Sequence, residues 1–406
     1  MLKTMLSEMK NRSLASLEKR WSPRALWFSQ WAETMLRAFD KNMPTVFTTY
    51  YTFPMEILAA FDVAHFDFEL AASMLASTEL AEPLLNRSDD LGYDTDLCSF
   101  HRASAGAHDM SLYPESGIFL TTSSFCNGKW KLNEALSRSM NAEPYLVSVP
   151  QDVSTESIHY VASQLKEAAE KISEVTRQSL DIDRLREALR ISNQARTAHQ
   201  RMLECLKHRP APWGGIQLVQ YSIFSRMFAG TKTQETIHKA FADTFEKRIE
   251  SGELRPETQR LYWFAWVPTY QTNIFDTFSQ HETAVVHCET LKVFWDELDI
   301  RNPFESLALK CLQDPFQGAI EHRLAGLEDL FDAYSIDGAV LFATPGCRHS
   351  NGGYSIIRDT VKNLGRPFLM LDVDIGDPRK YTPEQTGIRL EGFMELLNDR
   401  ERTAAS

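Results

Sequence analysis

Three of the six cysteines stand at positions from which their thiolates could bind one ligand together. Cys126 and Cys347 each follow a short apolar segment, over residues 116–122 and 338–344, that we expect to form a strand. Cys98 lies upstream in the polar segment Asp-Leu-Cys-Ser-Phe-His-Arg. Because open parallel sheets bind ligands at the carboxyl ends of their strands, we expect the three cysteines to share one cleft. Three thiolates there predict a metal cluster with one coordination position left open.

The pattern of these cysteines favours an iron–sulfur cluster over zinc. Iron–sulfur clusters accept cysteines from distant segments, whereas structural zinc takes four closed ligands and a catalytic three-cysteine zinc site is uncommon. The sequence contains no Cys-x-x-Cys, which argues against zinc ribbons, thioredoxin chemistry and ferredoxin-type clusters. The alternative stays open that these cysteines are merely small buried hydrophobes.

The remaining three cysteines are expected to be structural. Cys205 lies in the apolar stripe of a predicted helix, and Cys311 lies in the apolar segment Leu-Ala-Leu-Lys-Cys-Leu, so packing explains both. Cys288 ends a predicted strand immediately before Glu289, where a structural role is favoured as well.

Glu69 is the carboxylate with the best claim to a catalytic role. It ends a predicted strand over residues 63–69, at the same sheet edge as the cysteines, where a dry environment would suit a general base. An equally supported interpretation places Glu69 at a helix N-terminus, where the helix dipole stabilises its charge.

Other polar groups follow the predicted strand ends. Asp372 and Asp374 end the last strand, and we favour a loop-shaping or subunit-contact role for them. His101 and His349 each lie near a candidate cysteine, so we expect them to adjust its surroundings by hydrogen bonding.

Strand and helix patterns alternate in two parts of the chain, which predicts parallel sheets with helices on their faces. Strands are expected over residues 45–53, 63–69, 116–122, 143–150, 260–267, 283–288, 338–344 and 367–374. Between the two parts, apolar residues at steps of three and four predict long amphipathic helices. The predicted fold is α/β, with two pseudo-symmetric flavodoxin- or Rossmann-like parallel-sheet domains and a helical insertion between them. We place a helical leader at 1–42, the first domain at 43–152, the helical region at 153–255 and the second domain at 256–406.

Composition and missing motifs exclude several classes of function. A net charge of −12 argues against nucleic-acid binding. No apolar run approaches the roughly 18 residues of a membrane span, and the N-terminus lacks a signal-peptide block, so we expect a cytoplasmic protein without membrane contacts. The sequence has no P-loop, no Gly-x-Gly-x-x-Gly after a strand and no Gly-x-Ser-x-Gly elbow. Any redox power must therefore come from a partner.

Several segments between about residue 45 and residue 397 resemble the 2-hydroxyacyl-CoA dehydratase and benzoyl-CoA reductase family. The resemblance rests mainly on residues 96–103, 124–131 and 345–348. Weaker matches support it at residues 53–57, 181–188, 209–212, 374–379 and 389–393. Each pattern alone is weak, whereas their order and spacing together are specific.

The resemblance implies a site and a reaction. Cys98, Cys126 and Cys347 would ligate a [4Fe-4S] cluster, and Glu69 matches an acid that the family dehydratases place near the substrate. A related partner subunit would carry a second cluster, and an ATP-hydrolysing activator protein would supply one low-potential electron. That electron would reduce the thioester of an (R)-2-hydroxyacyl-CoA to a ketyl radical, which expels the 2-hydroxyl group. The resemblance thus implies one subunit of a heterodimeric, oxygen-sensitive dehydratase.

One departure from the family pattern leaves alternatives open. A serine that the dehydratases show before Phe-Pro-x-Glu is absent, and Thr49, Tyr50, Tyr51 and Thr52 occupy its neighbourhood. The context of residues 61–63 leans toward the benzoyl-CoA reductases, which begin ring reduction instead. The chain could also be a non-catalytic cluster carrier, a plain zinc protein, or a homodimeric relative whose larger cluster uses Cys288 and Cys311.

Overall fold

The chain contains two four-stranded sheets in which every strand pair is parallel. The computed structural model describes residues 1–48, 51–115, 117–142 and 144–405. The strands are β1 (Thr45–Thr48), β2 (Ala64–Phe66), β3 (Ile118–Thr122), β4 (Pro144–Val147), β5 (Gln259–Ala265), β6 (Thr283–Cys288), β7 (Gly338–Ala343) and β8 (Phe368–Asp372). The first sheet has the order β2-β1-β3-β4 and the second β6-β5-β7-β8, so both follow the same 2-1-3-4 topology. The predicted α/β class with two pseudo-symmetric sheets is confirmed.

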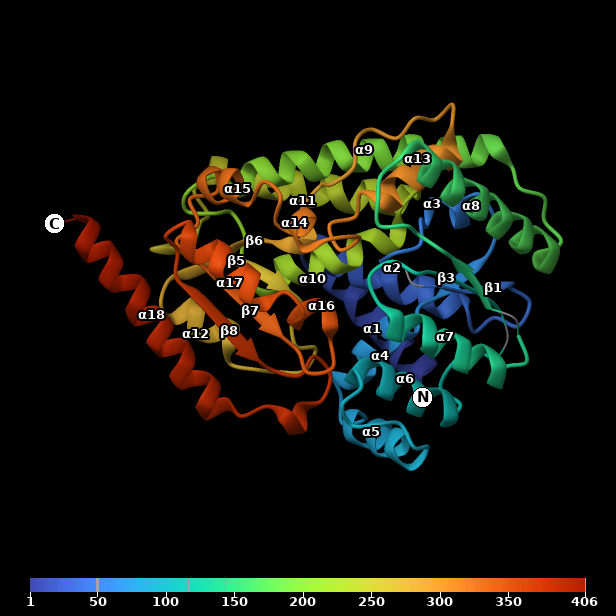
Figure 1. The fold of residues 1–406 in the computed structure, drawn as a ribbon, viewed down its shortest axis with the longest axis horizontal. Coiled ribbons are helices and arrows are strands. Elements are labelled where there is room, and N and C mark those ends of the chain that lie inside the picture. The colour runs from blue at the N-terminus through green and yellow to red at the C-terminus, as the bar shows by residue number, and fades with distance from the viewer. Residues whose placement is uncertain (49–50, 116, 143, 406) are drawn as a thin grey trace.

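Helices cover both sheets and connect them (Figure 1). Around the first sheet lie α1 (Leu2–Lys19), α2 (Pro23–Arg37), α3 (Glu56–Ala59), α4 (Phe68–Ala76), α5 (Ala81–Asp90), α6 (Ser99–Asp109) and α7 (Asn127–Ser139). The middle of the chain forms α8 (Thr155–Thr176), α9 (Ile182–Leu206), α10 (Ile216–Phe224) and α11 (Lys232–Ser251). The rest are α12 (Ile274–Gln280), α13 (Pro303–Leu312), α14 (Ile320–Leu324), α15 (Leu327–Ala333), α16 (Arg348–Asn351), α17 (Tyr354–Asn363) and α18 (Pro383–Ala405). No helix in the described ranges is both long and apolar enough to cross a bilayer.

The central strands are buried at every position, as a parallel sheet covered on both faces requires. In the first sheet, the Phe47 ring stacks on Phe119 at a centroid distance of 4.7 Å and on Phe68 at 5.0 Å. In the second, Trp263 and Phe264 of β5 are almost fully buried. Apolar runs that the sequence showed without alternation therefore form the cores of two sheets.

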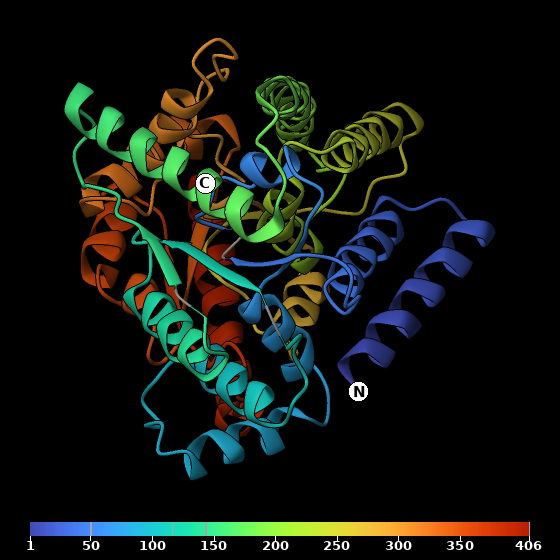
Figure 2. The ribbon, with the colours of Figure 1, turned by 90° about the vertical axis from the view of Figure 1, so that its right-hand side faces the viewer.

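The first helical segments form an antiparallel pair beside the first sheet (Figure 2). Ser22 caps α2 by accepting a hydrogen bond from the Ala25 N–H, and Pro23 occupies the first helical position, where its missing N–H costs nothing. Asp181 caps α9, because its carboxylate accepts hydrogen bonds from the N–H groups of Asp183 and Arg184. The domain boundaries drawn from the sequence stay a prediction.

The prediction that Glu69 ends a strand is wrong. Strand β2 stops at Phe66, and Glu69 lies in the first turn of α4. The physical reason is Asp67, whose carboxylate accepts a hydrogen bond from the Leu70 N–H at 3.0 Å and so caps a helix there. The alternative interpretation, a carboxylate at a helix N-terminus, is the correct one. Of the residues at which strands were expected to begin or continue, Thr49, Tyr50, Ser116 and Glu143 lie outside the described residues.

A buried ion pair joins α3, α9 and α13. The Lys310 ammonium lies 2.7 Å from Glu56 Oε1, and Ser192 Oγ donates to the same oxygen at 2.8 Å. Glu56 is fully buried, and burial opposes its ionisation, but the Lys310 charge outweighs this effect and lowers the pKa of the carboxyl. One carboxylate thus connects the first sheet unit to the helical region.

Replacing Lys310 by Met should lower the free energy of unfolding by about 3–5 kcal/mol, because it leaves a buried carboxylate without its cation. The double variant with Glu56→Gln should recover most of that loss. Urea unfolding measures both, and Lys207→Met, which breaks a solvent-exposed pair with Glu204, provides the control with a loss below about 1 kcal/mol. A Lys310→Met loss as small as that of the control would show that the pair contributes little.

Candidate functional site

The three candidate cysteines line one cavity of about 580 Å³. The segments that follow β3, β5, β7 and β8 contribute to its wall through Cys126, Trp266, Cys347 and Ile375. The cavity therefore lies at the carboxyl ends of strands from both sheets, where such sheets bind ligands. The structure brings Cys98 to this cavity with the other two, as the sequence predicted.

Each of these cysteines is the residue that precedes a helix. Cys98 occupies the N-cap position of α6, Cys126 that of α7 and Cys347 that of the short helix α16. The N-terminus of a helix carries partial positive charge, which favours a thiolate and acts against the effect of burial. The local sequence thus places each of the three sulfurs at the start of a helix.

Close backbone contacts bring the loops of Cys98 and Cys347 together. Gly346 has φ +74°, and a Cβ atom there would lie only 2.6 Å from the Asp96 carbonyl oxygen and 2.9 Å from the Cys98 nitrogen. A larger residue would therefore push the two loops apart. The Gly376 N–H also donates to Ser99 Oγ at 3.0 Å, which ties the end of the second sheet to α6.

The side chains of four residues contact one another in a row along the cavity wall, in the order Cys126, His101, Glu69 and Lys129. The His101 side chain hydrogen-bonds with Cys126, and its Nε2 lies 2.9 Å from Glu69 Oε1. Lys129 Nζ lies 2.5 Å from Glu69 Oε2, and the Lys129 side chain is only 4 % exposed. Three buried charges therefore compensate one another beside the Cys126 sulfur.

The protonation states of these four side chains follow from their contacts with one another. Burial opposes the charge on Glu69, but Lys129 and His101 together hold the pKa of this carboxyl well below its usual range. Burial also disfavours the imidazolium of His101, yet hydrogen bonds with Cys126 and Glu69 raise its pKa to about 9. Against the effect of burial, His101 lowers the pKa of the Cys126 thiol, whereas burial raises the pKa of Cys98 and Cys347. Cys126 is the one of the three whose environment favours the thiolate.

This arrangement disfavours Glu69 as a resting general base. A carboxylate whose two oxygens each contact a cation, with a depressed pKa, is a poor proton acceptor. What it does in this structure is to hold His101 and Lys129 in place.

Sequence reasoning missed Lys129. Lys129 follows Cys126 by one helical turn in Cys-Asn-Gly-Lys, so both residues lie on the same side of α7. This spacing is the signal by which the sequence could have revealed it. Its ammonium also lies 5.7 Å from the centroid of the Phe125 ring. The cavity therefore contains a buried lysine that composition and motifs did not reveal.

The two histidines differ in what they do. His101 contacts Cys126 and Glu69 as expected of a residue that adjusts the site. The His349 ring stacks on Phe125 at a centroid distance of 4.2 Å, and burial lowers its pKa to about 4. His349 donates a hydrogen bond to the Cys347 sulfur through its backbone N–H and not through its imidazole ring.

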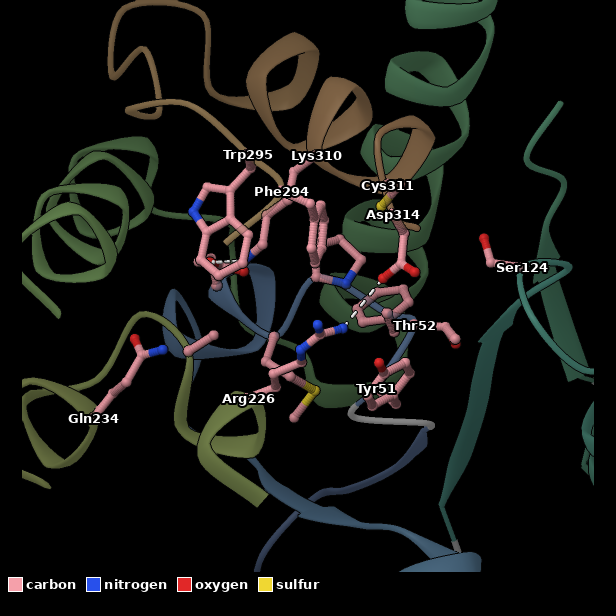
Figure 3. A pocket seen from close by; sticks show the side chains of 15 residues that line it. Tyr51, Thr52, Ser124, Arg226, Gln234, Phe294, Trp295, Lys310, Cys311 and Asp314 are labelled. Atoms are coloured by element: carbon pink, nitrogen blue, oxygen red, sulfur yellow. Dashed lines mark hydrogen bonds and ion pairs between the residues drawn. The ribbon is translucent and has the colours of Figure 1, made fainter. Parts of the chain in front are cut away.

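The other cysteines do not line this cavity. Cys288 is buried and contacts Ser222 Oγ at 3.4 Å and Thr290 Oγ1 at 3.3 Å. Cys311 is buried at a separate pocket of about 50 Å³ (Figure 3). Their positions give no support to a larger cluster that would use both of them.

Tyr51, in the neighbourhood of the missing serine, lines both pockets. Its ring packs edge-on against Trp266 at 5.3 Å and contacts Phe125, and the Arg226 guanidinium lies 4.2 Å from its centroid (Figure 3). Arg226 in turn pairs with Asp314 at 3.1 Å. An aromatic side chain thus lies between the cysteine cavity and the smaller pocket of about 50 Å³.

Asp374 shapes the loop after β8, as favoured from the sequence. Its Oδ1 accepts hydrogen bonds from the N–H groups of Gly376 at 3.0 Å and Asp377 at 2.9 Å. Asp372 is exposed.

Within the described ranges, no three His, Cys, Asp or Glu side chains are placed as the ligands of one metal ion.

Over residues 50–397 the chain matches the family described as 2-hydroxyglutaryl-CoA dehydratase, D-component. The chain belongs to this family. The resemblance expected from the cysteine segments, and with it the prediction of an enzyme, is confirmed by a match that covers most of the sequence.

Individual members of the family are distant from this chain. It is 22 % identical over 362 residues to the (R)-phenyllactyl-CoA dehydratase alpha subunit of Clostridium sporogenes, covering 85 % of this chain and 88 % of the relative. It is 24 % identical over 383 residues to a benzoyl-CoA reductase subunit of Thauera aromatica, covering 86 % and 88 %. It is 21 % identical over 387 residues to the (R)-2-hydroxyisocaproyl-CoA dehydratase alpha subunit of Clostridioides difficile, covering 90 % and 93 %.

Alkylation of the metal-free, reduced protein should distinguish the three cysteines. At about pH 7.5 we expect iodoacetamide to modify Cys126 at least about tenfold faster than Cys98 or Cys347, because only its thiol pKa is lowered. The rate at Cys126 should persist to lower pH than that of a free thiol, and mass spectrometry of the peptides measures it.

His101→Gln should slow the reaction at Cys126, whereas His108→Gln, on the same helix but in contact with Ser139, should not. Equal rates at all three cysteines would contradict the assigned role of His101.

Proposed function

We propose that this chain is the cluster- and substrate-binding subunit of a 2-hydroxyacyl-CoA dehydratase-type enzyme, which eliminates water from an (R)-2-hydroxyacyl-CoA. The observation that carries the proposal is one cavity of about 580 Å³ whose wall holds Cys98, Cys126 and Cys347 together with the buried Lys129–Glu69 pair. Membership of the family supports it, as do the names of the relatives, two of which are dehydratase alpha subunits.

The three cysteines suit a [4Fe-4S] cluster that leaves one iron free of protein ligands. Their sulfurs are soft ligands at helix N-termini, and His101 and Lys129 place positive charge beside the sulfur of Cys126. When bound, such a cluster supplies one low-potential electron to the thioester and a Lewis-acidic iron. Loss of water is redox-neutral overall, so the electron serves as a catalyst and is not consumed.

The residues of the chain supply the electrostatics. A thioester that has gained an electron carries negative charge on its oxygen, and Lys129 is the buried cation on the cavity wall that stabilises such charge. Glu69 fixes the position of Lys129 by pairing with it, and the aromatic rings of Phe125 and Trp266 exclude water from the wall.

The proposal includes two partner proteins. A related second subunit with its own cluster agrees with relatives that are named alpha subunits. An ATP-hydrolysing activator would inject the electron, which agrees with the absence of a P-loop from this sequence.

Ring reduction of an aryl-CoA is the second candidate function. The 24 % identity to a benzoyl-CoA reductase subunit favours it, as does an aromatic residue, Tyr51, on the cavity wall near the position of the missing serine. Both functions use the same cysteines and an acyl-CoA, so the product formed from each substrate decides between them.

Anaerobically purified protein should contain about four irons and four sulfides per chain. Cys126→Ala should lose most of the iron, because removing one of three ligands opens the site, while Cys205→Ala, outside the cavity, should keep it. Metal and sulfide analysis with EPR of the reduced protein measures both. Iron-free protein that is correctly folded, or a fully loaded Cys126→Ala variant, would refute the proposed site.

Lys129→Met and Glu69→Gln should each lower the turnover of the reconstituted enzyme by at least about a hundredfold, because the first removes the cation from the wall and the second removes the carboxylate that fixes it. The assay combines activator, ATP, reductant, partner subunit and a 2-hydroxyacyl-CoA, and iron content is measured in parallel. Arg138→Met, on the exposed face of the same helix, is the matched control. Unchanged turnover in Lys129→Met with full iron content would remove Lys129 from the mechanism.

A further inference from the structure

The first two helices contribute a wall to the cysteine cavity. Met9 of α1 and Phe28 and Trp31 of α2 line the same cavity as the three cysteines. The match to the family covers residues 50–397, so these residues precede the matched part of the chain. Trp31 is 3 % exposed, and its ring packs edge-on against Phe28 at a centroid distance of 6.3 Å.

Helix α4 supplies the adjoining part of this wall. Leu70, Ser73, Met74 and Ser77 line the cavity at spacings of three, one and three, which places them on one face of the helix. The row begins beside Glu69 and extends along the helix axis for about 12 Å, at 1.5 Å per residue. The hydroxyls of Ser73 and Ser77 donate to the carbonyls of Leu70 and Met74, at 2.7 and 2.6 Å, so their protons are not directed at a ligand.

The leader helices are anchored in this position. An ion pair between Lys10 and Glu33 joins α1 to α2. Thr233 Oγ1 donates to Gln30 Oε1 at 3.4 Å, which joins α2 to α11. Arg37 pairs with Asp62 at 2.9 Å, next to the start of β2. The wall is therefore part of the folded structure and not a loosely attached segment.

Charge is confined to the other parts of the cavity. Beyond Glu69, the lining residues that α1, α2 and α4 contribute within the described chain include no charged side chain. Two lining lysines are already paired, Lys129 with Glu69 and Lys131 with Glu134, and Arg348 is exposed. The Arg24 guanidinium, which lies 5.3 Å from the centroid of the Phe28 ring, is on an exposed side chain. A carboxylate buried at the leader wall would lose its hydration, whereas an apolar group there would gain by burial.

We propose that the leader helices and the face of α4 form the acyl-specificity pocket, which selects a bulky apolar acyl group, aromatic or branched, over a small or carboxylate-bearing one. The inference rests on the proposed function, because it takes an acyl-CoA as the ligand of the cavity. The edge-on rings of Phe28 and Trp31 provide an apolar surface against which an aromatic acyl group packs.

Binding of unreactive CoA esters tests the pocket without turnover. Calorimetry on the anaerobically purified chain compares 3-phenylpropionyl-CoA, propionyl-CoA and glutaryl-CoA, none of which carries the 2-hydroxyl group. The wild-type chain should bind the phenyl ester at least about tenfold more tightly than the other two. Phe28→Ala and Trp31→Ala should weaken binding of the phenyl ester and so reduce this preference to about threefold or less. Trp21→Ala, at a position that is 55 % exposed between α1 and α2, should behave as wild type.

The outcomes separate this inference from the proposed function. Binding of all three esters without preference, or a preference that survives Phe28→Ala, would overturn the specificity pocket and leave the proposed function standing. Failure of the folded wild-type chain to bind any CoA ester would overturn the proposed function and the pocket with it. Phe28 is only half-buried, so Phe28→Ala decides the question should Trp31→Ala fail to fold.

Discussion

The pairing of Glu69 with two cations is the interaction on which the cavity depends. Burying a carboxylate, an ammonium and an imidazolium in an aromatic cavity is costly for each alone, and the three become stable only together. Their balance lets the protein keep a positive charge beside Cys126, where it favours the thiolate. A carboxylate that looked catalytic in the sequence is thus the group that keeps the surrounding charges in place.

The two sheets explain why the cysteines meet. β3 and β7 occupy the same place in two sheets of identical order, so Cys126 and Cys347 leave equivalent strands at equivalent edges. Cys98 has no such counterpart in the second half and reaches the cavity through α6. The close approach of Gly346 to the Cys98 backbone, which no residue with a side chain allows, joins the two halves at the sulfurs. The cysteines come from both halves of the chain, so the cavity forms only where the two halves pack together.

Charged and apolar lining residues of the cavity lie in different parts of the chain. The sulfurs and the paired charges lie at or near the starts of α4, α6, α7 and α16, within the part of the chain that matches the family. The apolar wall comes partly from α1 and α2, before that part begins.

The sequence by itself determined the elements and the residues that could bind metal. Local periodicity predicted the eight strands that the described residues form, and two cysteines after predicted strands, with a third in a polar segment, predicted one shared cleft. The sequence did not show that Asp67 turns the segment of Glu69 into a helix, that Lys129 neutralises it, or that Trp31 lines the cavity. These facts are contacts between distant segments: His101 and Glu69 are 32 positions apart, Gly376 and Ser99 are 277. Periodicity reports which face of an element is buried, but only the packed tertiary structure decides which partner that face receives.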